Sequence, residues 1–391
     1  MSLKGISGRK IPYWRLSGFY FFYFALLGTM VPFLGLYLQS LEYSPAEIGQ
    51  VFAVMMATRI VAPNIWGWLA DRSGRRLFII RLGSLLACIS FSFLLWMNGF
   101  WWVVLIIAAY SFFWNAVLAQ FEVVTLNFLD GMTHYYGRIR LWGSVGFIVA
   151  VVVLGYVFDK LSVLYMPIAA LAMLFFMWVS SLSIKEQITT HTEHHLEEGF
   201  WQVCFSKPVL SFLLASFLLQ VSFGSYYTFY SVYLESLAYS RTSIGLLWGL
   251  GVVAEVVVFW YMHHIMNHFS LRQIMLLTLF ATVIRWWIIG CYPYLGALIF
   301  AQLLHAFAFG TAHAVSIELI RRFFQGGNQG QGQALYSSVS FGAGGAAGAL
   351  LSGWIWTVSP VASFALSTLF AALAFALVFW GVRGELVDKL K

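Results

Sequence analysis

The sequence predicts an all-α integral membrane protein with twelve transmembrane helices. Hydrophobic residues make up 61% of its 391 residues and charged residues only 9%, whereas soluble globular proteins carry about 45–50% apolar and about 25% charged residues. Apolar runs long enough to cross a hydrocarbon core, which takes about 20 residues, recur along the whole chain. These observations exclude a soluble enzyme and a disordered chain.

The gaps between the apolar runs, which are charged or rich in turn residues, set the expected order of the spans. The twelve spans are expected at residues 14–38, 46–70, 77–97, 101–128, 140–158, 162–183, 208–234, 242–264, 272–292, 295–319, 334–357 and 361–382. No small-residue cleavage site follows the basic N-terminus, so we expect the first span to be retained as a helix.

The longest polar stretch, residues 184–207, divides the spans into six and six. It is expected to be a cytoplasmic linker between an N-terminal six-helix bundle, residues 1–183, and a C-terminal six-helix bundle, residues 208–391.

The basic residues predict the orientation of the chain. With the N-terminus in the cytoplasm, 18 of the 22 Lys and Arg residues lie in inside segments or inside helix ends. Lys160 and Arg241 lie outside, while Arg59 and Arg285 fall within spans. Since cytoplasmic loops carry an excess of Lys and Arg, both termini are expected in the cytoplasm. The net charge of +7 therefore reflects membrane orientation and does not indicate a nucleic-acid partner.

An internal repeat relates the two halves of the chain. Residues 37–49 (YLQSLEYSPAEIG) and 233–245 (YLESLAYSRTSIG) match at eight of thirteen positions with an offset of 196. Two halves in parallel orientation are typical of one class of secondary transporters, in which the substrate binds between the halves near the midplane. The same offset places Arg59 opposite Glu255, so two related positions carry opposite charges at membrane depth.

Residues 67–76, GWLADRSGRR, resemble the G-x-x-x-D-[RK]-x-G-[RK]-[RK] signature of the major facilitator superfamily, in the loop between the second and third helices. In that family these residues are thought to latch the cytoplasmic ends of helices. The resemblance implies gating roles for Asp71, Arg72, Arg75 and Arg76. The second half keeps little of the motif, since Asn267 stands where the acid is expected.

A closer resemblance is to the phenylpropionate-permease branch of that superfamily, which is similar to the lactose permease and other proton symporters. It rests on YGRIRLWGSVGF (136–147), GLLWGLGVVAEV (245–256), RWWIIG (285–290) and LLHAFAFGTAH (303–313). Two pairs of charged residues, Glu122 with Arg140 and Arg285 with His305, have the same spacing as the corresponding pairs of the lactose permease. Glu255 matches its glutamate on the eighth helix.

The resemblance implies that Glu122 and Arg140 bind substrate and that Glu255, Arg285 and His305 take part in proton coupling. One departure is Ala308, where the lactose permease has a glutamate that works in coupling. If this chain is proton-driven, another acid must serve.

Ionisable residues within spans are candidates on physical grounds, because one at the centre of a helix costs about 2.5–3.5 kcal/mol. Glu255 is the expected proton carrier; the alternative is a fixed ion pair with an arginine. Arg59 and Arg285 can bind an anionic substrate or act as counter-ions, since arginine keeps its charge and offers a planar fork. His305 can relay a proton or hold helices together through hydrogen bonds, which neighbouring Gln302 also favours.

Two other charged groups have a local interpretation. Hydropathy alone places Glu122 and Arg140 near the cytoplasmic ends of their spans, where they would form a salt bridge; only the resemblance makes them a substrate pair. Glu318 precedes Arg321 and Arg322 by three and four residues, which is the spacing of a local ion pair on a helix surface.

Aromatic residues form 19% of the chain, and most are expected in lipid-facing, packing or interfacial positions. Five lie near the predicted cavity, where a ring can stack on an aromatic or sugar ring: Trp114, Trp142, Tyr226, Tyr227 and Trp248. Packing in the core explains any one of them equally well.

No cofactor or metal is expected. The linker holds His191, His194 and His195 with Glu193, Glu197 and Glu198, but a solvated loop explains them better than a metal site with no fixed ligand framework. Cys88, Cys204 and Cys291 indicate neither a disulfide nor a metal site.

The sequence thus predicts a proton-coupled symporter that takes up a small organic solute by alternating access, as a monomer in the lipids of a bacterial cytoplasmic membrane. An aromatic or other carboxylate is the favoured substrate, with Arg140, Glu122 and Arg59 binding it. The alternatives are a sugar, oligosaccharide or nucleoside symporter, an exporter or antiporter, and a receptor or lipid-handling protein on the same fold. No motif predicts an enzyme.

Overall fold

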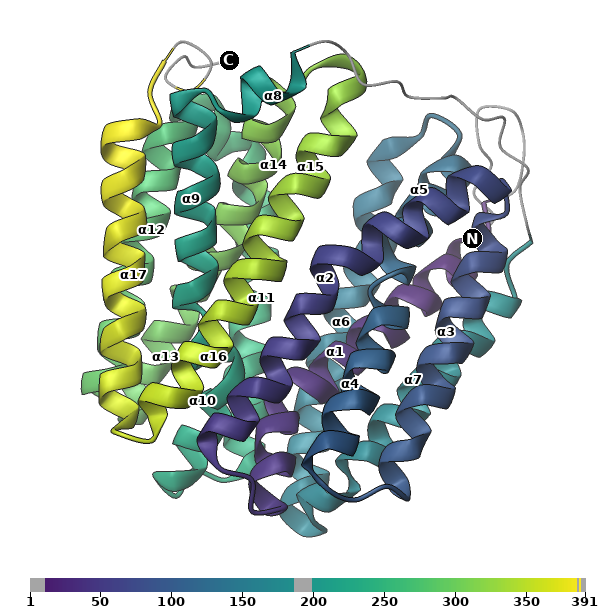
Figure 1. The fold of residues 1–391 in the computed structure, drawn as a ribbon, viewed down its shortest axis with the longest axis vertical. Helices are drawn as coiled ribbons and strands as arrows, with labels where there is room; N and C mark the ends of the chain where they lie inside the picture. The colour runs from purple at the N-terminus through teal and green to yellow at the C-terminus, as the bar shows by residue number, and fades with distance from the viewer. Residues whose placement is uncertain (1–10, 186–198, 385–386, 388–391) are drawn as a thin grey trace. The chain divides into compact units, whose positions relative to one another are not determined.

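The computed structural model describes residues 11–185, 199–384 and 387 (Figure 1). Twelve helices in these ranges are long and apolar enough to cross a membrane, and no strand occurs in this part of the chain. The fold class expected from the sequence is therefore confirmed. Most of the linker, including the histidines and glutamates of residues 191–198, lies outside the described residues.

The elements of the spans in chain order are α1 (Tyr13–Ser40), α2 (Pro45–Ser73), α3 (Arg76–Ser92), η1 (Phe93–Leu95), α4 (Phe100–Trp114), α5 (Val117–Leu129), α6 (Tyr136–Lys160), η3 (Val163–Tyr165), α7 (Met166–Leu182), α9 (Lys207–Ser222), α10 (Gly224–Ser236), α11 (Arg241–His268), α12 (Leu271–Cys291), α13 (Leu295–Leu303), η4 (Ala306–Thr311), α14 (Ala312–Phe323), α15 (Gln329–Ser337), η6 (Ser338–Gly344), α16 (Gly345–Trp356) and α17 (Pro360–Gly381). Short connecting helices are η2 (Thr133–Tyr135), α8 (Phe200–Cys204) and η5 (Gly326–Asn328).

The spans lie close to their predicted positions, and the largest differences are at helix ends. The tenth span continues to Phe323 instead of residue 319. Its last turn holds Arg321 and Arg322, whose ion pairs with Glu318 satisfy charges that hydropathy alone places in a loop. The eleventh span begins at Gln329 instead of residue 334, because polar glutamines and glycines there are helical although they are not apolar.

Contacts divide the chain into two compact units. Unit 1 comprises Met1–Tyr43, Val61–Thr192 and Tyr239–Gly249, and unit 2 comprises Ser44–Ile60, Glu193–Ala238 and Leu250–Lys391. The division passes through α2 and α11, so the first part of each of these helices belongs with the opposite half of the sequence. The predicted bundles, residues 1–183 and 208–391, remain a prediction.

In unit 1, α1 packs against α6 and α7, and α3 packs against α4 and α7 (Figure 1). Glycines allow the closest approach. A methyl group on Gly28 would lie 2.8 Å from the carbonyl oxygen of Phe147, and one on Gly146 would overlap the carbonyl of Phe21. Small residues at such crossings let helix backbones come together in a membrane, where packing replaces the hydrophobic effect as the driving force.

Unit 2 repeats this packing. Helix α17 lies against α9 and α12, and α10 lies against α16. A methyl group on Gly224 would overlap the backbone of Gly348, and one on Gly344 would lie 2.7 Å from the carbonyl oxygen of Phe217. Gly224 follows Gly28 by the same 196 residues that relate the sequence repeat, so the repeat extends from sequence to helix packing.

Four of the described spans are interrupted or contain a π-helical segment within their length, while the third ends and the sixth begins with a short 3-10 helix, η1 and η3. The fourth is interrupted between α4 and α5, and the seventh at Phe223 between α9 and α10. The tenth and eleventh contain π-helical segments, η4 and η6. Neither π segment holds a proline, so their sequences give no indication of the change, and π segments occur frequently at functional sites.

The first turn of α11 is held by a carboxylate from another helix of unit 1. Asp159, near the end of α6, accepts hydrogen bonds from the backbone amides of Arg241 at 2.7 Å and Thr242 at 2.8 Å. A negatively charged acceptor at a helix N-terminus satisfies amides that have no partner within the helix and complements its dipole. Asp159 therefore links α6 to α11.

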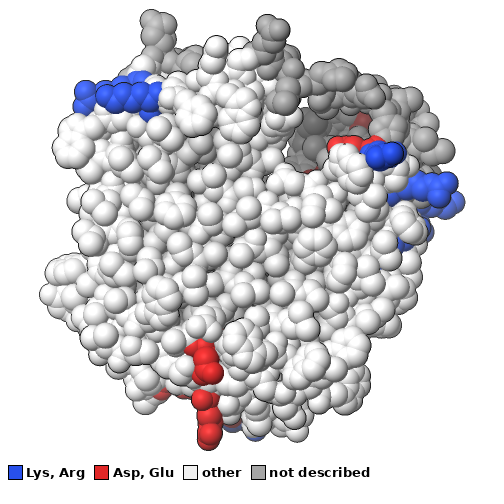
Figure 2. All heavy atoms as spheres, in the orientation of Figure 1, with Lys and Arg blue, Asp and Glu red and all other residues white. Residues whose placement is uncertain are grey.

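Much of the surface is apolar. Figure 2 shows that residues other than Lys, Arg, Asp and Glu cover most of the visible face. Large rings stand exposed, for example Trp260 at 84% and Trp101 at 77%. Exposed apolar area on this scale is typical of a surface in contact with lipid.

Candidate functional site

The deepest polar cluster in unit 2 is built around Arg285 of α12. Its side chain is fully buried, and its Nε donates a hydrogen bond to the carbonyl oxygen of Ala301 at 3.0 Å. The guanidinium lies 4.1 Å from the ring centre of Tyr226 and 4.4 Å from that of Trp286. Aromatic faces attract a cation most strongly where water is excluded, so these rings stabilise the buried charge.

Gln302 of α13 connects the arginine to α10. Its Oε1 accepts a hydrogen bond from the Tyr226 hydroxyl at 3.1 Å and another from Arg285 Nη2 at 3.3 Å. One amide oxygen thus holds two side chains from two other helices. The cluster therefore fixes the position of the guanidinium through Tyr226, Gln302 and the backbone of α13.

His305 and Glu255 lie beside this cluster. The Nε2 atom of His305 is 3.9 Å from Glu255 Oε2, and 18% of the Glu255 side chain is exposed. Two glycines make room: a methyl group on Gly310 would lie 2.8 Å from Glu255 Cγ, and one on Gly251 would lie 3.2 Å from the His305 ring. The structure therefore brings together the three residues predicted for proton coupling, Glu255, Arg285 and His305, within unit 2.

Three buried donors or acceptors of this cluster have no protein partner among the described residues. They are Arg285 Nη1, Gln302 Nε2 and His305 Nδ1. Buried polar atoms are nearly always hydrogen-bonded, to protein or to ordered water, and water needs several such partners to occupy a buried site. Arg285 Nη1 and Gln302 Nε2 are donors, so bound water can accept hydrogen bonds from them.

Arg59 of α2 also belongs to unit 2, and it is half-buried. Glu255, the position related to Arg59 by the sequence repeat, belongs to the same unit. Tyr227 stacks on Phe223 with ring centres 5.3 Å apart.

Unit 1 contains the second predicted pair. Arg140 Nε of α6 lies 4.0 Å from Glu122 Oε1 of α5, and about a third of each side chain is exposed, 31% and 36%. The Tyr136 hydroxyl donates to the same Glu122 oxygen at 3.2 Å. The Arg140 guanidinium lies 3.9 Å from the ring centre of Phe24. This site presents a cation, a carboxylate and aromatic rings on an accessible surface.

The predicted tryptophans lie in different places. Trp114 is buried and stacks on Tyr23, with ring centres 4.8 Å apart. Trp142 donates from its Nε1 to the Tyr13 hydroxyl at 3.1 Å, near the start of α1. Trp248 is buried on the part of α11 that belongs to unit 1. Their roles in binding substrate remain predictions.

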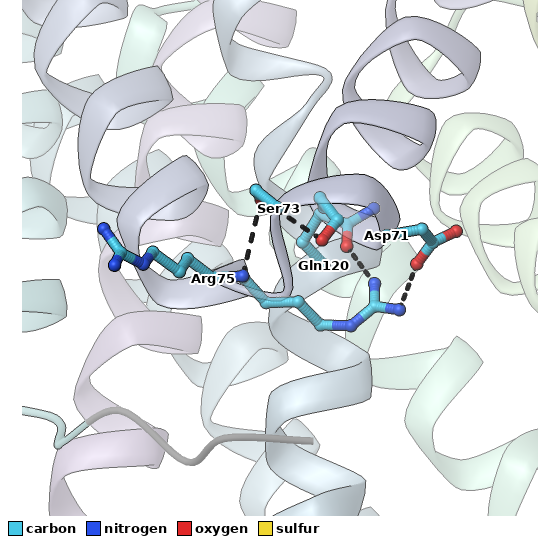
Figure 3. A network of polar contacts seen from close by, with 6 residues as sticks. Asp71, Ser73, Arg75 and Gln120 are labelled. Carbon is cyan, nitrogen blue, oxygen red and sulfur yellow. Dashed lines mark hydrogen bonds and ion pairs between the residues drawn. The ribbon is translucent and has the colours of Figure 1, made fainter. Parts of the chain in front are cut away.

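The motif between α2 and α3 forms a network (Figure 3). The Arg76 guanidinium contacts the carboxylate of Asp71 and also donates to the amide oxygen of Gln120 on α5. The Arg72 guanidinium lies 5.3 Å from the ring centre of Trp68, while the backbone amide of Arg75 bonds to the Ser73 hydroxyl. The network joins three helices of unit 1, and the gating role of these residues remains a prediction.

Sequence reasoning missed Gln120, Tyr136 and the two binding roles of Gln302. Tyr136 lies one turn before Arg140 and Gln302 one turn before His305, so a search for polar residues at helical spacing around each intramembrane charge would have found both. Gln120 contacts Arg76 from another helix, and no local pattern reveals it. The local ion pair of Glu318 with Arg321 at 2.7 Å and Arg322 at 3.0 Å is confirmed.

Comparison with known proteins reveals one family model that matches residues 13–366; its description is the MFS_1 like family. A probable 3-phenylpropionic acid transporter of Escherichia coli K12 is 27% identical over 357 residues, which cover 88% of this chain and 90% of the relative. A maltose permease of Geobacillus stearothermophilus is 22% identical over 373 residues, which cover 92% of this chain and 93% of the relative.

Among solved structures, the nucleoside transporter NupG superposes with a TM-score of 0.79 at 17% identity, covering 94% of this chain and 97% of that chain. An auto-inhibited peptide transporter of the POT family superposes with a TM-score of 0.75 at 12% identity, covering 97% of this chain and 98% of that chain. These likenesses establish the fold. The relatives and structural neighbours are membrane transporters and not enzymes.

Proposed function

The chain belongs to the MFS_1 like family and is a multi-pass membrane transporter, and from that premise we propose that it is a secondary active symporter. It couples the uptake of a small organic carboxylate to protons by alternating access. The observation that carries the proposal is the cluster of unit 2, in which Glu255 lies 3.9 Å from His305 and Arg285 is fully buried. Intramembrane ionisable groups are costly and mark ion pathways by default.

Glu255 carries the proton in this proposal. Its carboxyl is the one acidic group of the cluster described above, and the 18% of its side chain that is exposed gives a proton access. The Nε2 atom of His305 lies 3.9 Å from one carboxylate oxygen of Glu255. Arg285 supplies a fixed positive charge that favours release of the proton from Glu255. Arg285 and His305 therefore tune Glu255 without leaving their positions.

The substrate binds at cations. Arg140 is accessible, lies over an aromatic ring and has a planar fork that suits a carboxylate. Phe24, which is half-buried and whose ring centre lies 3.9 Å from the Arg140 guanidinium, suits an aromatic ring attached to that carboxylate. The relative described as a probable 3-phenylpropionic acid transporter supports the same class of solute. Arg59 is a second candidate for the anion.

The experiment uses the purified protein in liposomes that contain a pH-sensitive dye. 3-Phenylpropionate, benzoate, maltose and uridine are added outside in turn. We expect internal acidification with an aromatic carboxylate, its loss in Glu255→Gln, and wild-type behaviour in Glu42→Gln, an exposed carboxylate in the turn after α1. Acidification that survives Glu255→Gln would refute the proton-carrier assignment, and alkalinisation would identify an antiporter.

A sugar or nucleoside substrate is the second candidate, favoured by the Glu122–Arg140 pair with the Tyr136 hydroxyl, since such groups bind sugar hydroxyls. Glu122→Gln separates the two. It removes a negative charge beside Arg140, so it should tighten the binding of a carboxylate several-fold, whereas it should weaken the binding of a sugar that hydrogen-bonds to Glu122.

The cellular setting completes the proposal. The excess of Lys and Arg in the predicted inside segments favours a bacterial cytoplasmic membrane with both termini in the cytoplasm. The apolar surface favours lipids as neighbours, and the protein is proposed to act as a monomer without nucleic-acid partners or cofactors.

A further inference from the structure

A small cavity with polar groups in its wall lies in unit 2, beside the Glu255 cluster. Its volume of about 10 Å³ is about what the centre of a single water molecule needs. Five elements supply its walls: α9, η4, α14, α15 and η6. The lining residues are Ser216, Leu219, Gln220, Ala308, Phe309, Ala312, His313, Tyr336 and Phe341.

Ser216 makes this cavity different from a packing defect. Its side chain is only 2% exposed, and its Oγ has no hydrogen-bond partner among the described residues. Gln220, one turn later on α9, is 7% exposed and also lines the cavity. Empty cavities in proteins are apolar, whereas small cavities with several polar walls hold ordered water. Ser216, Gln220 and His313 provide those walls.

The cavity is connected to the proton-coupling cluster by a stack of rings on the tenth span. The rings of His305 and Phe309 have centres 5.6 Å apart and planes 5° apart, and those of Phe309 and His313 are 6.5 Å and 7° apart. On a regular α-helix, residues eight positions apart point about 80° away from each other. The π segment η4 takes up this rotation and places His305 and His313 on one face, with Phe309 between them.

We propose that the cavity binds one water molecule and that this water and His313 form a second proton site. This site lies between Glu255 and the end of the tenth span at Phe323. The proton leaves the Glu255 carboxyl, which becomes a carboxylate, and reaches His313 through His305 and water, giving an imidazolium. His313 then gives the proton to bulk water and returns to the neutral imidazole. Phe309 separates the two sites, so the proton passes only when that ring moves.

The surroundings of His313 fit this role. The lining side chains that face it come from α9 (Ser216, Gln220), α15 (Tyr336) and η6 (Phe341). His313 and Tyr336 are the titratable groups among the lining residues. The imidazole is the side chain whose charge changes most readily near neutral pH.

This inference rests on the proposed proton coupling, and the experiment separates the two. Ser216→Ala removes the hydroxyl, Ser216→Val also fills the space, and His313→Gln removes the titratable ring; His263→Gln, an exposed histidine on α11, is the control. The substrate probe is 3-phenylpropionate in liposomes. We expect the three variants to lower proton-driven net uptake at least tenfold and to leave substrate exchange, which needs no net proton movement, within twofold.

Net uptake within twofold of wild type in all three variants, with Glu255→Gln inactive, would overturn the second proton site and leave the proposed function intact. Uptake that survives Glu255→Gln would instead refute the proposed function.

A measurement on the wild-type protein serves if the variants do not fold. Radiolytic hydroxyl-radical labelling oxidises buried rings that touch ordered water. We expect oxidation of Tyr336, which is 5% exposed and lines the cavity, but not of Tyr110, which is 1% exposed and does not. Equal absence of oxidation in both tyrosines would show a dry cavity and overturn the proposal.

Discussion

The two units place similar residue types under opposite conditions. In unit 1, Glu122 and Arg140 face each other with about a third of each side chain exposed. In unit 2, Arg285, Gln302 and His305 are nearly or fully buried, and each keeps one polar atom with no protein partner among the described residues. An exposed ion pair contributes about 0–1 kcal/mol, whereas a buried charge costs several. The difference supports the proposed division of roles, in which the pair of unit 1 binds the solute and the cluster of unit 2 carries the proton.

The sharpest way to break this comparison is to replace each arginine by lysine. Arg285→Lys loses the planar group that stacks on Tyr226 and bonds to Gln302 and the backbone, and hydrogen bonds of a charged group contribute about 1.5–3 kcal/mol each. We expect proton-driven uptake of 3-phenylpropionate in liposomes to fall by about a hundredfold. Arg140→Lys keeps its charge beside Glu122 and should lose about tenfold or less. The reverse order would contradict the division of roles.

Adding a methyl group tests whether the repeated packing is equally tight in the two units. Gly28→Ala and Gly224→Ala force a methyl group against a backbone carbonyl, and overpacking costs about 1–3 kcal/mol. We expect both variants to lower the melting temperature by several degrees, Gly224→Ala more, because its methyl group meets both the backbone of Gly348 and the Ser352 hydroxyl.

Gly137→Ala is the matched control, because open space surrounds that position and alanine favours a helix by about 1 kcal/mol. A fall in melting temperature as large as that of Gly28→Ala would show that glycine replacement itself, and not the close approach of helices, is the cause.

Removing the charge of Asp159 sharpens the account of unit 1. Asp159→Asn weakens the acceptor of the first amides of α11, and loss of such a cap costs about 1 kcal/mol, or about a fivefold change in an equilibrium. We expect residues 239–249 to exchange their amide hydrogens about fivefold faster in Asp159→Asn, measured by mass spectrometry. The control variant Glu42→Gln should leave amide exchange in this segment unchanged. Equal exchange in the wild type and in Asp159→Asn would contradict the role of Asp159 in holding α11 to α6.

The smallest effect is the accessibility of two cysteines to a thiol reagent, which tests the orientation of the chain in the membrane. Cys291 is exposed at the end of α12, whereas Cys204 is buried in α8. With the predicted orientation, an impermeant maleimide added outside should label Cys291. Burial raises the pKa of the Cys204 thiol, so less of it is thiolate at neutral pH, and its labelling from the inside should be slow and keep rising at alkaline pH. Labelling of Cys291 only from the inside would invert the orientation.

The sequence was sufficient for the spans because the cost of burying charge in lipid leaves a strong pattern of apolar runs. It also predicted that Glu122 pairs with Arg140 and that Glu255 and His305 belong together, although the second inference came from the resemblance and not from spacing. The ion pairs of Glu318 followed from helical periodicity alone.

Other features depend on the fold and leave no local pattern. Whether Arg285 meets an acid or aromatic rings is decided by which helices pack on α12, and the structure gives it Tyr226 and Trp286. Gln120 meets Arg76 only because α5 and α3 are neighbours. The π segments reflect tertiary packing that outweighs the preference of the chain for regular α-helix.

The π segment η4 also means that the tenth span holds about one residue more than a regular α-helix of the same phase needs. Deleting one residue within 306–311 would allow a regular α-helix to form, in which His305 and the present His313 would stand seven positions apart and point within about 20° of one another. Glu318, Arg321 and Arg322 would keep their pairing. A relative with a gap of one position in this stretch would therefore keep both the fold and the common face of the two histidines, because this chain fits its additional residue into the span without turning the end of the helix.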